Sequence, residues 1–269
     1  MTQKQLHHAR SSDGTALGHW TVGDGPPLVL VHGSLGDHSR WDALLPHLTP
    51  HVTVHAMDRR GRGASGDAPD YDLTREYEDV AAVVDAVAAE AGAPVDVYAS
   101  SYGGICAFGA AQLTQNIGRL ALYEGWPAVE PSALAGPAGT VERMEQLLGE
   151  GRREAALVTA YRDLVGLTEA EIAEVRSQPS WPARVAAVHT IVREERAFQE
   201  CRFDPYQAGN VEVPVLLLVG EDSPVWGPQA ETVMAALPDA RITVLEGQGH
   251  VADLVAPSLV ADALLPFLH

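Results

Sequence analysis

Short apolar runs rich in β-branched residues alternate along this chain with longer stretches of helical periodicity. Several runs are apolar almost throughout, which is typical of strands that helices cover on both faces. One intervening stretch, Thr74–Gly92, begins with a capping Thr and early acidic residues and ends in Gly, as a helix does. The alternation predicts an α/β fold with a parallel sheet wrapped on both sides. The predicted strands are Pro27–Gly33, Val52–Asp58, Pro94–Ser100, Arg119–Gly125, Pro214–Gly220 and Ala240–Gly247.

The middle of the chain departs from this rhythm. From about residue 126 to about residue 210 there are helical patterns, such as residues 140–150 and 180–200, and no convincing strand. Ligands of open α/β folds bind beyond the carboxyl ends of the strands. We therefore expect residues 126–210 to form a helical cap over that edge, with residues 1–125 and 211–269 forming the core. Upstream, an antiparallel hairpin that turns at Asp13-Gly14 is expected.

Composition argues against several classes of function. The chain has 18 Lys and Arg against 36 Asp and Glu, and its net charge of −18 repels nucleic acids and anionic membranes. Lys4 is the single lysine, so Schiff-base chemistry is disfavoured, and two distant cysteines suggest neither a disulfide framework nor a metal site. There is no signal-like segment, membrane-length apolar run, phosphate loop or dinucleotide fingerprint. We expect a cytoplasmic protein with a small-molecule substrate and no cofactor, and its oligomeric state is left open.

The stretch VYASSYGGI, residues 97–105, places two serines where a predicted strand ends. A nucleophile at a sharp strand-to-helix turn needs small residues two positions before and after it, because the backbone doubles back there. With Ser101 at the apex these positions hold Ala99 and Gly103, whereas with Ser100 they would hold two tyrosines. Ser101 is therefore the predicted nucleophile, and a serine that merely caps the following helix is the alternative.

A serine hydroxyl needs a base to remove its proton and fixed donors for the oxyanion that it forms. His250 follows the last predicted strand in a Gly-rich loop and is the predicted base. One donor would be the backbone N–H of Tyr102, directly after the nucleophile. The other should follow the first parallel strand, at Ser34 or at Leu35.

Five segments resemble the α/β-hydrolase family, in family order and over nearly the whole chain outside the cap. The resemblance implies an eight-stranded, mostly parallel sheet, a helical cap after the sixth strand and a Ser–His–acid triad. Members with dehalogenase or epoxide hydrolase activity have an Asp nucleophile, so Ser101 argues against both activities. The segments are VLVHGSLGDHSRWDALLPHL, MDRRGRGASGD, ASSYGG, PVLLLVGEDSPV and GQGHVADL.

The third member of the triad has two candidates. Many relatives carry the acid after the seventh strand in a G-x-x-D-P pattern, but here GEDSP has Ser223 at that position. Asp222 could serve if the loop shifts by one residue. Other relatives, haloalkane dehalogenases among them, carry the acid directly after the sixth strand, where this chain has Glu124. We favour Glu124 and keep Asp222 as the alternative.

The resemblance and the residues together predict a serine hydrolase that cleaves an ester, thioester or lactone through an acyl-Ser101 intermediate. The alternatives are an acyltransferase or cyclase of natural-product assembly, or a ligand-binding protein that retains the triad. His32 and the arginines of DRRGRG are expected to brace loops rather than to contact substrate. Residues that could contact a small, largely apolar substrate, or could instead pack within the cap, are Leu35, Trp126, Met144, Tyr161, Trp181, His189 and Phe198.

Overall fold

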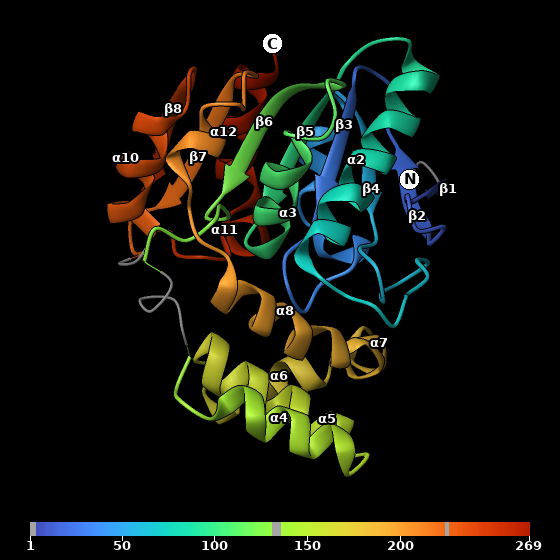
Figure 1. The fold of residues 1–269 in the computed structure, drawn as a ribbon, viewed down its shortest axis with the longest axis vertical. Helices are drawn as coiled ribbons and strands as arrows, with labels where there is room; N and C mark the ends of the chain where they lie inside the picture. Colours follow the sequence, from blue (N-terminus) through green and yellow to red (C-terminus); the bar gives the residue numbers. More distant parts are fainter. Residues whose placement is uncertain (1–3, 131–135, 224–225) are drawn as a thin grey trace. The chain divides into compact units, whose positions relative to one another are not determined.

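The computed structural model describes residues 4–130, 136–223 and 226–269, and within them an eight-stranded sheet forms (Figure 1). The strands lie in the order β1-β2-β4-β3-β5-β6-β7-β8. β2 pairs antiparallel with β1 and β4, and every other neighbouring pair is parallel. This is the predicted mostly parallel sheet. The strands are β1 (Gln5–Arg10), β2 (Ala16–Val22), β3 (Pro27–Val31), β4 (Thr53–Met57), β5 (Val95–Ser100), β6 (Ile117–Tyr123), β7 (Val215–Gly220) and β8 (Ala240–Leu245).

The predicted hairpin is confirmed. β1 and β2 pair from Gln5 opposite Thr21 to Arg10 opposite Ala16. Gly14 in the turn has φ +89°, a conformation that glycine adopts without the steric cost that a side chain brings. The Asp13 carboxylate accepts the Thr15 N–H at 2.8 Å, which closes the turn as an Asx motif.

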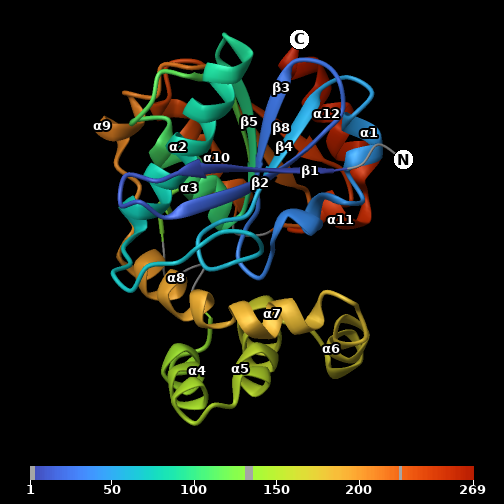
Figure 2. The same ribbon diagram turned by 90° about the vertical axis from the view of Figure 1, so that its right-hand side faces the viewer.

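Helices cover both faces of the sheet (Figure 2). The helices α2 (Leu73–Ala91), α3 (Tyr102–Ala110) and α10 (Trp226–Ala236) lie on one face. On the other face lie α1 (Leu45–Leu48), α11 (Ala252–Val255) and α12 (Pro257–Leu268). Short elements η1 (His38–Trp41) and α9 (Pro205–Ala208) complete this part of the chain.

Local signals set the ends of α2 and differ slightly from expectation. The N-cap is Asp72, two residues before the predicted Thr74, because the Asp72 carboxylate accepts the N–H groups of Thr74 and Arg75. A charged oxygen at this position stabilises a helix start better than a hydroxyl that itself donates to it. The C-terminal end at Gly92, with φ +69°, is as predicted.

A hydrophobic core cluster lies between the sheet and the helices α1 and α12. Leu28 and Leu30 of β3 pack there with Leu264 of α12, and all three are fully buried. Each such side chain contributes about 1.5–3 kcal/mol through removal of apolar surface from water. This packing gives the parallel strands a rigid base, so loops at their carboxyl ends are held in fixed positions.

The described residues from 130 to 201 form a second compact unit, made of helices that are inserted between β6 and β7. The insertion after the sixth strand is as expected. By contacts, residues 126–129 and 202–210, which the sequence pattern places in the cap, group with the sheet. The unit consists of α4 (Thr140–Gly149), α5 (Arg153–Thr159), η3 (Ala160–Val165), α6 (Glu169–Arg176), α7 (Trp181–Ala187) and α8 (His189–Glu200).

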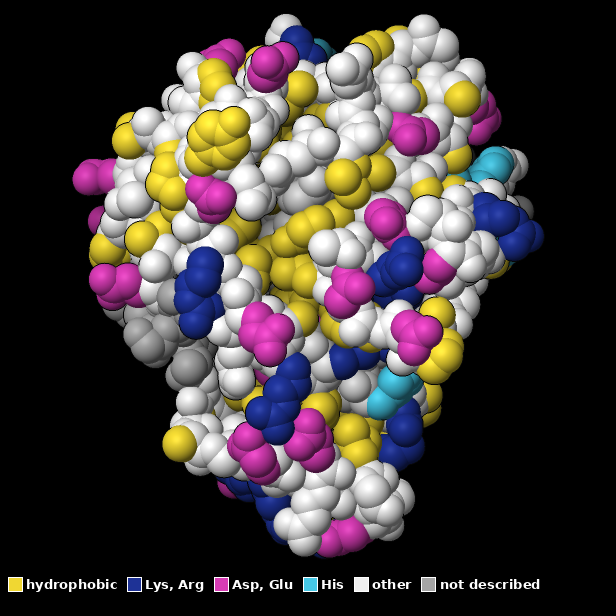
Figure 3. All heavy atoms as spheres, viewed as in Figure 1, with side chains coloured by type: hydrophobic (Ala, Val, Ile, Leu, Met, Phe, Trp, Pro, Cys, Tyr) yellow, Lys and Arg dark blue, Asp and Glu magenta, His cyan; other side chains and the backbone are white. Residues whose placement is uncertain are grey.

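Among the described residues, no helix is both long and apolar enough to cross a lipid bilayer. The face shown in Figure 3 carries acidic side chains scattered among Lys and Arg side chains. On this face the acidic side chains are thus dispersed and do not gather into a single patch.

Three imidazoles lie next to one another across the antiparallel edge of the sheet. The ring of His19 on β2 lies 5.4 Å from that of His7 on β1 and 5.6 Å from that of His55 on β4. His19 and His55 are buried. Burial, together with the neighbouring histidines and against an opposing effect of Glu90, lowers the pKa of His19 to about 4. Burial and His7 lower the pKa of His55 to about 4.

These two histidines should make the protein acid-sensitive. In the unfolded chain their pKa is about 6.5, so they bind protons below that pH. In the folded state they stay neutral down to about pH 4. The free energy of unfolding is therefore highest above pH 6.5 and falls as the pH drops toward 4. At pH 5 each of the two histidines should have lowered it by about 2 kcal/mol.

Urea unfolding at pH 5 and pH 7 tests this expectation on the variant His19→Gln. The loss of unfolding free energy between the two pH values should be smaller in the variant by about 2 kcal/mol. The exposed His51 gives the matched control His51→Gln, which should keep the wild-type loss. If wild type and both variants lose equal unfolding free energy between pH 7 and pH 5, the buried His19 is not a source of the acid sensitivity.

Candidate active site

Ser101 lies at a strained turn between β5 and α3. Its backbone has φ +54° and ψ −133°, a combination that residues other than glycine rarely adopt. The turn is held by the Ser101 N–H, which donates to the Tyr123 carbonyl at 2.9 Å, and by the Gly104 N–H, which donates to the Ser101 carbonyl. The strain presents the Ser101 hydroxyl at the carboxyl edge of the sheet.

Four glycines around Ser101 give the turn its room. A Cβ on Gly103 would collide with the carbonyl oxygens of Val31 and His32, so the position requires a small residue as predicted, but the crowding comes from β3 and its loop and not from the turn itself. A Cβ on Gly33 would lie 2.8 Å from the Ser101 Cβ. Cβ atoms on Gly104 and Gly125 would collide with the Gly125 and Ser101 carbonyls, respectively. Sequence reasoning missed the last three glycines. The second glycine after the serine and the Gly of HGS were available signals for Gly104 and Gly33, whereas the residues around Gly125 carry no such signal.

The two adjacent serines have different environments. Ser100 ends β5, is 1% exposed, and its hydroxyl has no hydrogen-bond partner within the part of the chain that the structure describes. Ser101 is half-buried, and its Oγ lies 3.0 Å from the His250 Nε2. Only the second arrangement lets a base accept the hydroxyl proton.

His250 connects Ser101 to a buried carboxylate. The His250 Nδ1 lies 2.6 Å from the Glu124 Oε2. Glu124 follows β6 directly, is fully buried and has φ +44°. Its other oxygen, Oε1, accepts the Gly220 N–H at 2.7 Å, which fixes the carboxylate plane. Ser101, His250 and Glu124 thus form a continuous hydrogen-bonded chain with the geometry of a catalytic triad.

Asp222 lies elsewhere. It is exposed, and its carboxylate has no hydrogen bond to any described residue. Its backbone N–H donates to the Gln248 carbonyl at 2.9 Å, so the residue braces the loop that carries His250. Tyr123 supports the same loop, because its hydroxyl donates to the Gly249 carbonyl. Burial, reinforced by Glu124, raises the pKa of Tyr123, which keeps the phenol protonated as a donor. The last two residues of PVLLLVGEDSPV lie outside the described residues.

The loop after β3 passes beside the Ser101 hydroxyl. A Cβ on Gly33 would lie 3.3 Å from the Ser101 Oγ, so the backbone that leads to Ser34 borders the hydroxyl. Leu35 has φ +62°, an uncommon conformation for a side chain with a γ-branch. Tyr102 is the first residue of α3, where backbone N–H groups lack partners within the helix. The N–H groups predicted to hold an oxyanion therefore come from two segments that meet at Ser101.

His32 and Arg59 brace these loops. The His32 Nδ1 lies 2.8 Å from the Gly33 carbonyl, and its Nε2 accepts the Arg59 N–H at 3.2 Å. Burial, with help from Arg59 and Arg62, lowers the pKa of His32 to about 3, so the ring stays neutral. Arg59 forms a fully buried bidentate ion pair with Glu76.

Arg60 forms a second buried bidentate pair, with Asp79. Arg62 is 3% exposed. All three arginines of DRRGRG are thus buried in the protein, as their expected bracing role requires.

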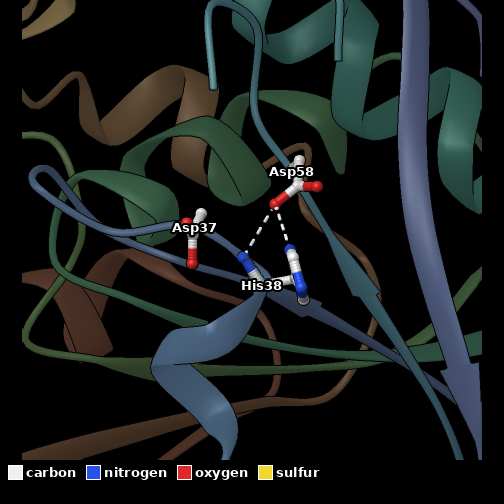
Figure 4. Close-up of side chains that lie close together, drawn as sticks. All are labelled: Asp37, His38 and Asp58. Atoms are coloured by element: carbon white, nitrogen blue, oxygen red, sulfur yellow. Dashed lines mark hydrogen bonds and ion pairs between the residues drawn. The ribbon is translucent and has the colours of Figure 1, made fainter. Parts of the chain in front are cut away.

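Asp37, His38 and Asp58 lie close enough together to resemble a metal site (Figure 4). The Asp58 Oδ1 accepts the backbone N–H of His38 and lies 2.8 Å from its Nδ1. The Asp58 Oδ2 accepts from Trp20 and Ala64 at 3.0 and 2.9 Å. Burial alone would raise the pKa of Asp58, but the hydrogen bonds from His38 and Ala64 lower it. Nitrogen donors thus already use both oxygens, and the cluster is better explained as an anchor for the loop after β4.

Most of the predicted substrate-contacting residues pack within the unit to which they belong. Tyr161 stacks on Trp181 at 6.0 Å and accepts a hydrogen bond from Arg184, while Trp181 donates to Glu154. The His189 Nδ1 lies 2.9 Å from the Arg153 guanidinium. Met144 is also buried, and Phe198 is half-buried. In the sheet-containing unit, Leu35 is half-buried and Trp126 is fully buried against Trp226.

Comparisons with known proteins agree with this fold and site. The family model described as "Alpha/beta hydrolase family" matches residues 28–263. The chain belongs to the alpha/beta hydrolase family.

A crystal structure of an alpha/beta hydrolase from Sphaerobacter thermophilus DSM 20745 is 34% identical, with a TM-score of 0.83 over 98% of this chain and 100% of that chain. A hydrolase from Pseudomonas aeruginosa PA01 is 26% identical, with a TM-score of 0.75 over 98% of each chain. Among curated proteins, the pimeloyl-[acyl-carrier protein] methyl ester esterase of Neisseria meningitidis serogroup B is 26% identical over 83% of this chain and 85% of its own length.

Proposed function

We propose that this protein hydrolyses a carboxylic ester-type bond, an ester, thioester or lactone, through an acyl-Ser101 intermediate. The observation that carries the proposal is the hydrogen-bonded chain from the Ser101 Oγ through His250 to the buried Glu124, with distances of 3.0 and 2.6 Å. The strained backbone at Ser101 supports the same role, because such strain is concentrated at functional sites. The relative from Neisseria meningitidis is named as an ester hydrolase, which also favours this bond type.

In the first half-reaction, the His250 Nε2 accepts the Ser101 proton while the Ser101 Oγ forms a bond to the substrate carbonyl carbon. The carbonyl oxygen becomes an oxyanion and the imidazole becomes a cation. When the tetrahedral intermediate collapses, the bond to the leaving group breaks and His250 transfers its proton to that group. The acyl group then remains on Ser101.

In the second half-reaction, a water molecule replaces the leaving group. His250 accepts a proton from the water as its oxygen attacks the acyl carbon, and then returns the proton to the Ser101 Oγ as the acid product leaves. Glu124 keeps the proton of His250 on Nδ1 and stabilises the imidazolium in both halves. The charge on Glu124 is constant throughout.

The oxyanion would be held by the backbone N–H of Tyr102 and by that of Ser34 or Leu35. Loss of one such donor typically slows acyl transfer by about 10²–10³. Esters, thioesters and lactones all suit this chemistry, since the carbonyl of each forms the same kind of tetrahedral oxyanion. We further propose that Leu35 contacts the substrate, since it is half-buried in the loop that adjoins Ser101.

Turnover of p-nitrophenyl esters with acyl chains of increasing length tests the proposal. We expect release of p-nitrophenol with one preferred chain length, and loss of this release in Ser101→Ala. A wild-type protein that forms a stable fluorophosphonate adduct but turns over no ester, thioester or lactone would contradict hydrolysis. That outcome would favour acyl transfer, cyclisation or ligand binding at the same serine.

A further inference from the structure

The indole of Trp226 lies against the His250 imidazole. The two ring planes are within 4° of parallel, and their centroids are 6.0 Å apart, so the rings are offset-stacked. Trp226 is the first residue of α10, the helix that follows β7. Its ring is held from the side by Trp126, whose ring is perpendicular to it at 89° and 5.1 Å away. Trp126 is fully buried two residues after Glu124, so it gives Trp226 a rigid support.

We propose that Trp226 is a positioning residue for His250, whose indole stabilises the imidazolium cation of the catalytic cycle and holds the ring in the plane that joins Glu124 to Ser101. The inference rests on the proposed function. A cation stacked over the face of an indole is attracted by the ring quadrupole when it lies within about 6 Å of the ring centroid. This attraction uses the face of the imidazole, so both ring nitrogens remain available for their hydrogen bonds.

His250 needs such support because its side chain is 43% exposed and is carried by a loop with Gly247 and Gly249 on its N-terminal side. Tyr123 also stacks on the imidazole, at 6.5 Å and 25°. Without these rings the imidazole could rotate away from Ser101, since a single hydrogen bond to Glu124 does not fix the ring plane.

Several titratable or charged groups surround His250. Glu124 contacts Nδ1, and the phenol of Tyr123 stacks on the ring from β6. On the loop after β7, Glu221 accepts the Gly247 N–H and Asp222 is exposed. Replacement of Trp226 leaves these charges unchanged, so a change in the His250 pKa reports the indole itself.

Arg40 of η1 and Asp253 of α11, the helix that follows His250, form an ion pair. Because the two charges are opposite and are joined by two hydrogen bonds, their combined effect on His250 is small and is the same in every variant.

The test is an NMR titration of the His250 ring in a Ser101→Ala background, which needs no turnover. The His250 resonance is assigned by its loss in His250→Gln. We expect Trp226→Leu to lower the His250 pKa by about 0.5 pH unit, and Trp226→Phe, which retains an aromatic face, to lower it by less. A raised or unchanged pKa in Trp226→Leu would overturn the proposal, because removal of an indole that only excludes water would raise the pKa.

A kinetic experiment complements the titration in the active protein. In Trp226→Leu the acid limb of kcat/KM against pH should move to lower pH by the same amount, while kcat falls several-fold and KM changes little. The matched control Trp20→Leu makes the same substitution at an indole that stacks on His38 and not on His250, so its acid limb should not move. If the acid limb of Trp226→Leu stays at the wild-type position and only KM changes, the result contradicts the proposal. If wild-type protein hydrolyses no ester, the proposed function fails, yet the titration still tests the role of Trp226.

Discussion

Replacing Ser101 with alanine should lower ester hydrolysis by about 10⁴–10⁶, with the protein still folded. The loss is this large because no other described hydroxyl lies on the His250 Nε2. Alanine removes the attacking oxygen and keeps the Cβ that packs beside Gly33. Initial rates on the preferred p-nitrophenyl ester measure the effect, and thermal unfolding checks the fold.

The neighbouring serine provides the matched control. Ser100→Ala removes a buried hydroxyl that has no partner among the described residues, so activity should stay within a few-fold of wild type. The free energy of unfolding should be unchanged or raised by about 1 kcal/mol, because an unsatisfied polar group is removed. Activity lost in Ser100→Ala but retained in Ser101→Ala would mean that the nucleophile is misassigned.

Replacing Glu124 with glutamine should slow turnover by about 10³–10⁴. The glutamine oxygen can still accept the Gly220 N–H, so the loop should keep its shape. Its NH₂ group then faces the His250 Nδ1 and donates to it. The proton of the neutral imidazole is thereby moved to Nε2, which can no longer accept the Ser101 proton, and the imidazolium loses its counter-charge.

Asp222→Asn is the matched acidic control. Because the Asp222 carboxylate is exposed and bonds to no described residue, its conversion to an amide should leave kcat within a few-fold of wild type. Single-turnover acylation of Ser101 is the measurement, since a triad acid acts on the step in which His250 becomes a cation. Fast acylation in Glu124→Gln together with slow acylation in Asp222→Asn would reverse the two roles.

The sequence predicts the fold because a parallel sheet covered on both faces imposes local demands. Runs such as Pro214–Gly220 must be apolar throughout, and β7 is buried along its whole length. The turn at Ser101 is recognised because Gly103 lies at a fixed spacing from the nucleophile, although the backbone that excludes a Cβ there belongs to Val31 and His32 of a distant segment. Steric demands of this kind leave a readable mark at fixed spacing.

Other features depend on segments that are distant in sequence. Gly125 must be small because it packs on the Ser101 carbonyl, and no pattern around Gly125 contains that information. Trp226 reaches His250 only because α10 follows β7 at the same edge of the sheet. Likewise, the choice between Glu124 and Asp222 depended on which loop lies under the imidazole, and spacing alone left both open.

Site mapping of a fluorophosphonate adduct tests the account most directly. After reaction with the wild-type protein, peptide mass spectrometry locates the phosphonyl group on one of the two adjacent serines. We predict that it lies on Ser101, and that labelling is slowed strongly by His250→Gln or Glu124→Gln and little by Asp222→Asn. An adduct on Ser100, or labelling of Ser101 at an undiminished rate without His250, would contradict the central claim.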